Sequence, residues 1–281
     1  MKTILYATDY SENSVSALRL AYSLAKKFSA KLIVMHVFDM PITLASTVTV
    51  SYLKKEEKLY VENRAKLKNF FDHNLDTVEM YMDLNFVIYE GTSVSSSILE
   101  NAIKFNADLI CVGAKGASVL KELLLGSTAK TLLKKSPCAL LVVPANSEKT
   151  QLNKMVYATD FEQADIFAIT KLAKIAQKFD AQIRVVHITT RNEYDGEGQM
   201  EWFKDTLREK VDYAKMEFDL VFSEQIFEDL LWYLENAEAD LLVMLERKEG
   251  AFYQKYFQPD LVQQMVKISS VPLLSFNVGG L

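Results

Sequence analysis

The sequence predicts an α/β protein made of two tandem, doubly wound domains, each with a mainly five-stranded parallel sheet flanked by helices. Two observations predict this fold. Short apolar runs rich in β-branched residues alternate with longer segments whose apolar residues recur at helical spacing, which is typical of a parallel sheet covered on both faces. In addition, the second half of the chain repeats the first.

The repeat begins with Lys2–Tyr10, which returns as Asn153–Phe161 with Tyr-Ala-Thr-Asp identical, at an offset of 151 residues. A later run, Ala107–Val112, returns as Ala239–Met244 at an offset of 132. One repeat of this length indicates tandem domains rather than a solenoid. The join lies near 144–151, a polar stretch that follows a proline. The predicted domains are 1–146 and 152–281.

Each element of the first half follows from its own pattern. Helical spacing predicts helices from Val15 to Phe28, after a cap at Ser11, and over 52–71, 93–105 and 129–135. The last strand of each sheet, 139–143 and 272–276, leaves an exposed edge that needs cover, and the sequence does not tell which edges meet. Short apolar runs predict the five strands Thr3–Ala7, Leu32–Val37, Asn85–Tyr89, Leu109–Val112 and Ala139–Val143.

Composition points to a cytoplasmic protein that neither crosses a membrane nor binds nucleic acid. No run approaches the ~18 apolar residues of a membrane span, and the N-terminus reads as a first strand rather than a signal peptide. Cys111 and Cys138 both lie in apolar runs, which favours reduced core thiols over a disulfide. Residues 1–144 carry 17 basic and 14 acidic side chains, whereas residues 145–281 carry 15 and 23, so the acidic half is unsuited to nucleic acid.

Three of the four glycines in the first 150 residues form a motif, G-x2-G-x9-G-[ST], made by Gly113, Gly116 and Gly126 followed by Ser127 and Thr128. Glycine suits backbone that has a positive φ or approaches another group closely. Free amides in such turns bind anions, and a helix beginning after Gly126 would add its positive end. The motif therefore predicts a phosphate site. Lys115 is read as a solvated loop lysine in preference to a phosphate contact.

Three predicted strands end in residues that support the same site. Asp9, Val37 and Gly113 each stand at the carboxyl end of a predicted strand. In open parallel sheets, ligands bind beyond these ends, at the point where the strand order reverses. We therefore expect the three positions to converge. Asp9 has an alternative role, since its carboxylate can instead cap the next helix or bond nearby backbone.

With these motifs, and with Ser-Pro-Cys-Ala-Leu-Leu-Val-Val-Pro before the join, nearly the whole chain resembles the universal stress protein family in its tandem form. The resemblance implies an adenine nucleotide alpha hydrolase-like fold and ATP, with Mg²⁺ or Mn²⁺ carried by the nucleotide. It also implies that edge strands pair across a two-fold axis, as an intramolecular pseudo-dimer with a possible homodimer beyond it. It places Asp9 against adenosine, the Val37 backbone at the adenine edge, and the glycine motif on the phosphates. The implied nucleotide-binding set is Ala7, Thr8, Asp9, Val37, Val112, Gly113, Gly116, Gly126, Ser127 and Thr128.

The second half lacks the glycine motif. At the offset of 132, Leu245 stands for Gly113, Lys248 for Gly116, Gln258 for Gly126 and Pro259 for Ser127. Pro259 removes an amide that a phosphate would need. We therefore expect one nucleotide per chain, in the first domain. The aromatic run 252–257 fills the corresponding stretch and is expected either to plug the vacated site or to contact a partner.

No catalytic constellation accompanies the motif. His36 and His187 occupy equivalent positions without a cluster of metal ligands, so we interpret both as structural. The chain has neither G-x-x-x-x-G-K-[ST] nor G-x-G-x-x-G, and no base is placed to activate water, so at most slow ATP hydrolysis is expected. The leading hypothesis is an ATP-binding sensor or regulator in the stress response. The alternatives are a nucleotide-independent interaction module of the same fold and an enzyme for another phosphorylated substrate.

Overall fold

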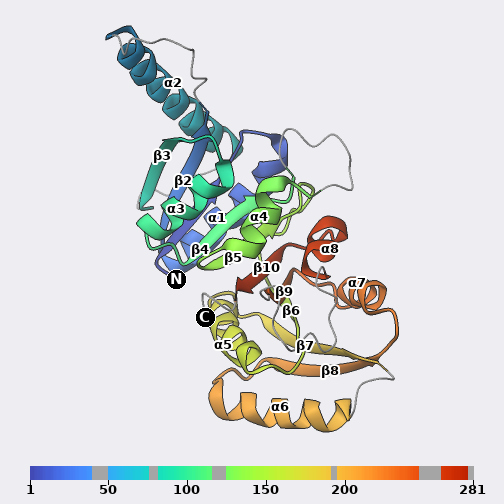
Figure 1. The fold of residues 1–281 in the computed structure, drawn as a ribbon. Coiled ribbons are helices and arrows are strands. Elements are labelled where there is room, and N and C mark those ends of the chain that lie inside the picture. The colour runs from blue at the N-terminus through green and yellow to red at the C-terminus, as the bar shows by residue number, and fades with distance from the viewer. Residues whose placement is uncertain (40–49, 76–81, 116–124, 191–194, 247–260, 278–281) are drawn as a thin grey trace.

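The computed structural model describes residues 1–39, 50–75, 82–115, 125–190, 195–246 and 261–277. The chain folds as one ten-stranded sheet with helices on both faces (Figure 1). The first half contributes β1 (Thr3–Ala7), η1 (Glu12–Ser14), α1 (Val15–Phe28), β2 (Lys31–Phe38), α2 (Val50–Asn74), β3 (Leu84–Glu90), α3 (Val94–Lys104), β4 (Leu109–Gly113), α4 (Ser127–Lys135) and β5 (Ala139–Val143). The second contributes β6 (Lys154–Ala158), α5 (Gln163–Phe179), β7 (Gln182–Thr189), α6 (Gly196–Lys210), β8 (Met216–Phe222), α7 (Ile226–Asn236), β9 (Leu241–Glu246), α8 (Leu261–Ile268) and β10 (Leu273–Asn277).

The strand order is β3-β2-β1-β4-β5-β10-β9-β6-β7-β8, so the two halves meet in the middle of the sheet. Every pairing within a half is parallel, as predicted, and only the β5–β10 pair is antiparallel among the described strands. In that pair Leu274 faces Leu141. This answers the question that the sequence left open, because the last strand of each half covers the edge of the other.

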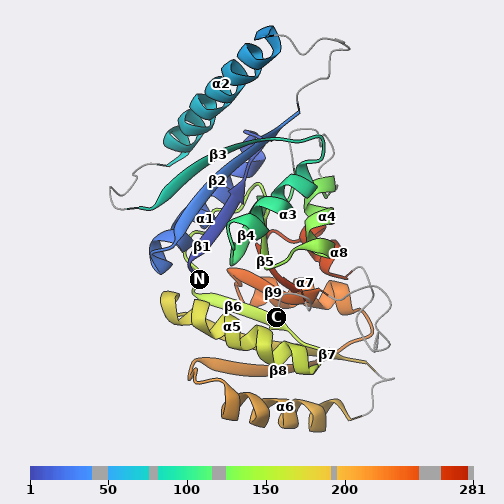
Figure 2. The ribbon, with the colours of Figure 1, turned by 60° about the vertical axis from the view of Figure 1, so that its left-hand side comes forward.

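The helices divide between the two faces of the sheet (Figures 1 and 2). One apolar cluster joins α1, α2, α5 and α6 to the sheet, and the other joins α3, α4, α7 and α8. The first cluster contains residues of both halves, including Leu18 of α1 and Leu172 of α5, which are fully buried. Truncating a buried leucine to alanine costs about 2–5 kcal/mol, so each such side chain contributes substantially to the core that the two halves share.

Helix α1 shows one difference from the predicted helix. Ser11 precedes η1 rather than α1, and its side chain makes no capping bond. Its hydroxyl instead donates to Oδ1 of Asp9 at 2.6 Å. Helix α1 follows with Ser14 as its N-cap and ends at Phe28, and its C-cap Ser29 has a φ of 50°. The local carboxylate competes for the hydroxyl that would otherwise cap the helix.

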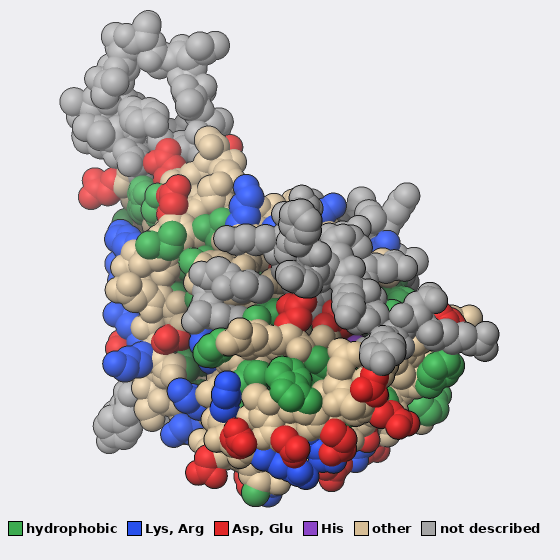
Figure 3. Space-filling model, turned by 60° about the horizontal axis from the view of Figure 1, so that its bottom comes forward, with side chains coloured by type: hydrophobic (Ala, Val, Ile, Leu, Met, Phe, Trp, Pro, Cys, Tyr) green, Lys and Arg blue, Asp and Glu red, His purple; other side chains and the backbone are tan. Residues whose placement is uncertain are grey.

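On the far side of the second half, α6 presents charged side chains to solvent. Acidic and basic groups are intermixed on this surface (Figure 3). Lys204 pairs with Glu201 at 3.1 Å and Arg208 with Asp205 at 3.3 Å, both one turn apart on the helix. Such exposed pairs each contribute only about 0.3–0.5 kcal/mol. None of the helices in the described part of the chain has the length and apolar character needed to cross a membrane.

Candidate functional site

A cavity of about 300 Å³ opens at the carboxyl ends of β1, β2 and β4, where the strand order reverses. This β1–β4 cavity falls at the lower end of the size range of small-molecule sites. Helices α3 and α4 form its far wall. Its lining residues are Ala7, Thr8, Asp9, Ser14, Val37, Val94, Ile98, Val112, Gly113, Lys115, Gly126, Ser127, Thr128 and Ala129.

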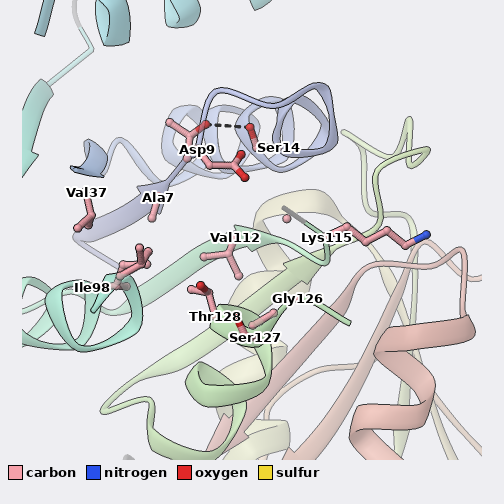
Figure 4. A pocket seen from close by; sticks show the side chains of 14 residues that line it. Ala7, Asp9, Ser14, Val37, Ile98, Val112, Lys115, Gly126, Ser127 and Thr128 are labelled. Carbon is pink, nitrogen blue, oxygen red and sulfur yellow. Dashed lines mark hydrogen bonds between the residues drawn. The ribbon is translucent and has the colours of Figure 1, made fainter. Parts of the chain in front are cut away.

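Nine of the ten residues that the sequence singled out line this one cavity. The tenth, Gly116, lies outside the described residues. The convergence expected for Asp9, Val37 and Gly113 is therefore present, whereas their contacts with a ligand stay a prediction. Lys115 also lines the cavity, but its side chain extends away from the other labelled residues (Figure 4).

The two ends of the β1–β4 cavity differ in polarity (Figure 4). Ala7, Val37 and Ile98 lie at one end and offer an apolar surface. Ser127 and Thr128 lie on the side opposite Asp9 and bring hydroxyl groups. The cavity thus presents apolar contacts at one end, a carboxylate on one side and hydroxyl donors on the other.

Asp9 sits in a tight turn between β1 and η1. Its Oδ1 accepts hydrogen bonds from the Ser11 amide at 3.0 Å and from the Ser11 hydroxyl at 2.6 Å. The residue between them, Tyr10, has a φ of 66°, in the left-handed region that most side chains avoid. The carboxylate therefore bonds nearby backbone, as the alternative interpretation held, and it also lines the cavity.

Aromatic stacking anchors that turn. The Tyr10 ring stacks on His36 with 4.0 Å between centroids, and the Lys66 ammonium lies 4.4 Å from the Tyr10 ring centroid. The Tyr10 hydroxyl also donates to the carbonyl of Asn63 on α2, at 3.2 Å. Contacts from β2 and α2 thus hold the strained residue next to Asp9.

The histidines of β2 and β7 each bond to the main chain, which agrees with the structural role expected for them. The Nδ1 of His36 donates to the Thr8 carbonyl at 2.8 Å, and that of His187 to the Thr159 carbonyl at 2.7 Å. Burial lowers the pKa of His36, an effect that the Thr8 hydrogen bond partly opposes. Each ring therefore fixes the main chain just after β1 or β6. No set of three His, Cys, Asp or Glu side chains suited to a metal ion occurs in the described ranges.

Gly113 is required by close approach and not by a positive φ. A Cβ at this position would lie 2.9 Å from the carbonyl oxygen of Asn13 and 3.3 Å from that of Lys115. A Cβ contact of 2.9 Å essentially never occurs unless something shifts, a contact of 3.3 Å is tighter than most, and both neighbours are backbone. Glycine at position 113 is therefore explained by the close approach of other backbone and not by a positive φ.

The N-terminus of α4 brings main-chain amides to the cavity. Gly126 is the N-cap of α4, with a φ of −61°, and its own amide donates to the Ala114 carbonyl at 3.0 Å. The first intrahelical bond runs from the Lys130 amide to the Gly126 carbonyl. The amides of Ser127 and Thr128 therefore have no acceptor within the helix, and they sit at the positive end of its dipole. This is the arrangement that binds anions.

Four lining residues were not predicted from the sequence: Ser14, Val94, Ile98 and Ala129. Ser14 is buried, and its hydroxyl shares a 2.8 Å hydrogen bond with that of Thr8. The repeat indicated that this position differs between the halves, because the offset of 151 aligns the hydroxyl of Ser14 with the carboxylate of Asp165. Val94 and Ile98 stand one turn apart on α3 and gave no signal beyond ordinary amphipathic spacing.

The second half keeps the equivalents of Thr8 and His36 but changes the groups around them. Asp165, fully buried, accepts hydrogen bonds from the Thr159 hydroxyl at 2.8 Å and from the amides of Asp160 and Glu162 at 3.1 and 3.0 Å. Leu245, at the position of Gly113, is buried in the core. Residues 248, 252–257, 258 and 259, on which the other predicted losses fall, lie outside the described residues.

Comparison with known proteins identifies the family. The profile of the universal stress protein family matches residues 1–144. A universal stress protein of Methanocaldococcus jannaschii is 31% identical over 142 residues, covering 50% of this chain and 81% of the relative. Universal stress protein YxiE of Bacillus subtilis is 31% identical over 144 residues, covering 50% and 97%.

A solved structure extends the likeness over both halves. The crystal structure of a universal stress protein from Archaeoglobus fulgidus superposes with a TM-score of 0.74 at 17% identity, covering 99% of this chain and 98% of that one. At this identity the comparison concerns the fold alone. With one half matching single-domain relatives and the whole chain matching a structure of the same extent, the protein belongs to the universal stress protein family in its tandem form.

Proposed function

We propose that the β1–β4 cavity binds ATP and that the protein acts as a nucleotide-dependent sensor or regulator in the stress response. The proposal is supported above all by three features that line one cavity. They are the N-terminus of α4, the hydroxyls of Ser127 and Thr128, and the closely packed backbone at Gly113. These groups suit phosphate oxygens. The apolar end formed by Ala7, Val37 and Ile98 suits a flat base.

Charge sets the direction of the nucleotide. A triphosphate is repelled by the Asp9 carboxylate and attracted by the positive end of α4, so its phosphates lie toward Ser127 and Thr128. The ribose hydroxyls then lie toward Asp9, whose oxygens accept hydrogen bonds from such donors. Mg²⁺ or Mn²⁺ would enter on the phosphates and reduce their charge.

Rapid hydrolysis is not part of the proposal. Asp9 is the one carboxylate among the described residues that line the cavity, and its Oδ1 already accepts two hydrogen bonds from Ser11. It also lies across the cavity from the proposed phosphate end (Figure 4). A general base must reach the water that attacks the phosphate. Slow turnover suits a protein that reports nucleotide levels by its bound state.

We further propose one ATP per chain. The buried Asp165 places a negative charge where the first half has the neutral Ser14, and Leu245 fills the position of Gly113. Both changes oppose a polyphosphate. Calorimetry that finds two equivalent ATP sites per chain would contradict this proposal.

The decisive experiment identifies nucleotide released by denaturing freshly purified protein, by mass, and follows thermal melts with Mg-ATP. At 100 times Kd the bound nucleotide should stabilise the fold by about 2.7 kcal/mol. The double variant Ser127→Ala/Thr128→Val should bind ATP at least about ten-fold more weakly, since it loses two hydrogen bonds to charged oxygens. Thr131→Val, in the same helix but outside the cavity, is the matched control. No stabilisation of the parent protein by Mg-ATP would favour the nucleotide-independent interaction module, and equal stabilisation of all three proteins would move the nucleotide away from Ser127 and Thr128.

A further inference from the structure

A second cavity, of about 410 Å³, lies between the two halves at the amino ends of β4 and β5. The first half contributes Phe28 and Asp108, and the second contributes Lys171 and Lys174 of α5 and Phe276 of β10. This interdomain cavity lies at the amino ends of the strands, whereas the β1–β4 cavity lies at the carboxyl ends. It is independent of the nucleotide proposal.

The repeat supplies a counterpart for comparison. Asp108 accepts hydrogen bonds from the amides of Lys2 and Thr3, and its equivalent Asp240 accepts them from the amides of Asn153 and Lys154. At Asp240 the linker between the halves completes the site, because the Lys149 ammonium donates to Oδ1 at 2.6 Å. The polypeptide itself therefore lies on the surface that corresponds to the interdomain cavity.

The linker is held there by hydroxyl groups of α1. Ser16 donates to the Ala145 carbonyl at 2.6 Å, and Ser23 donates to the Thr150 carbonyl at 2.7 Å. Leu152, which ends the linker, is buried. The surface on the α1 side is thus built to bind main-chain carbonyls and an apolar side chain, which is the chemistry of a polypeptide segment.

The corresponding positions of α5 carry different chemistry. At the offset of 151, Lys174 replaces Ser23, Lys171 replaces Leu20, and Phe167 replaces Ser16. The hydroxyls that hold a polypeptide are absent, and two ammonium groups stand in the lining. Among the described lining residues, Asp108 supplies the one carboxylate, and two main-chain amides already neutralise it in part. The described lining therefore favours an anion over a second polypeptide segment.

We propose that the interdomain cavity binds a small amphipathic carboxylate. The carboxylate lies against Lys171 and Lys174, and the apolar body lies against Phe28, Ile175 and Phe276. A cavity of this volume suits such a ligand, since small-molecule sites combine mainly apolar walls with a few charged groups. Because both halves line the cavity, a ligand bound there contacts both domains at once.

Cys138 provides a reporter, because it lines the cavity and is partly exposed, whereas Cys111 is buried. Burial raises the pKa of the Cys138 thiol to about 11, so alkylation by iodoacetamide is slow and easily timed at mildly alkaline pH. The probe is 4-phenylbutyrate, with 4-phenylbutanol as its uncharged equivalent. At ten times its Kd, measured by calorimetry, 4-phenylbutyrate should slow alkylation roughly ten-fold, and 4-phenylbutanol should leave it unchanged.

The matched variants are Lys171→Met/Lys174→Met, which keeps the aliphatic length, and Lys210→Met, an exposed lysine at the end of α6. The double variant should lose protection of Cys138 and bind 4-phenylbutyrate at least about ten-fold more weakly, whereas Lys210→Met should match the parent protein. Three results would overturn the proposal: no protection by millimolar 4-phenylbutyrate in the parent protein, equal protection by the alcohol, or unchanged affinity in the double variant.

Discussion

The hydroxyl of Tyr157 donates a 2.7 Å hydrogen bond to the carboxylate of Asp165, and both side chains are fully buried. In the first half, the equivalent Tyr6 donates instead to the main-chain carbonyl of Ser14, at 2.8 Å. The same tyrosine thus holds the turn after the first strand of each half through a different acceptor. A neutral hydroxyl lines a cavity in one half, and a buried carboxylate organises the turn in the other.

The Asp165 network should be the more costly to remove. Asp165→Ala leaves the hydroxyls of Tyr157 and Thr159 and two amides without their acceptor, and we expect a loss of about 3 kcal/mol or more in the free energy of unfolding. Ser14→Ala removes hydrogen bonds between neutral groups and should cost about 1 kcal/mol. Urea titrations followed by circular dichroism measure both. Equal midpoints would show that the carboxylate is no more important than the hydroxyl.

Gly113 and Gly126 should respond differently to alanine. The new Cβ of Gly113→Ala meets the Asn13 carbonyl at 2.9 Å, so η1 must shift and the fold should lose about 1–3 kcal/mol. Gly126 has ordinary negative φ at an N-cap, where alanine should cost about 1 kcal/mol or less. Thermal melts without nucleotide provide the comparison. A smaller loss at Gly113 than at Gly126 would contradict the close-approach explanation.

The sequence predicted the fold well because the repeat and the alternation of strands with helices are properties of local pattern. It did not predict the pairing of β5 with β10, since both strands are short apolar runs whose partners are far away in the chain. Leu274 and Leu141, which face each other in this pair, both belong to the apolar cluster that the two halves share, and that cluster is visible only in three dimensions.

The candidate site was predicted in part, for a similar reason. Asp9, Val37 and Gly113 were readable because strand ends meet at one edge of a parallel sheet. Ser14 was not predicted, because its alignment with Asp165 marks a difference between the halves but only the folded turn, in which Tyr6 donates to its carbonyl, shows it in the lining. The sequence also offered two reasons for Gly113, and only the position of the Asn13 carbonyl decides between them.

The two halves should stay together when the linker is cut. Antiparallel β5–β10 pairing and the shared apolar cluster both join them, and Lys27 lies 5.3 Å from the Phe179 ring centroid while its equivalent Lys178 lies 5.9 Å from that of Phe28. A protease site inserted after the exposed Asn146 should yield two fragments that co-elute on size exclusion at the volume of the intact protein. Adding Leu274→Asp, which buries a charge in that pairing, should separate them. Separation without this substitution would show that the linker alone holds the halves.

Stability should fall in acid partly through His36. Burial lowers the pKa of this histidine below its ordinary value of 6.5, so the folded state holds the neutral ring while the unfolded chain takes up a proton. Its contribution is therefore complete above that value and is lost as the pH falls below it. Lys66, near the stacked Tyr10, acts in the same direction, whereas Asp9 opposes it. His36→Gln should flatten the decline in melting temperature below about pH 6.5, and His73→Gln, an exposed position on α2, should not. Parallel pH profiles for the parent protein and His36→Gln would contradict the prediction.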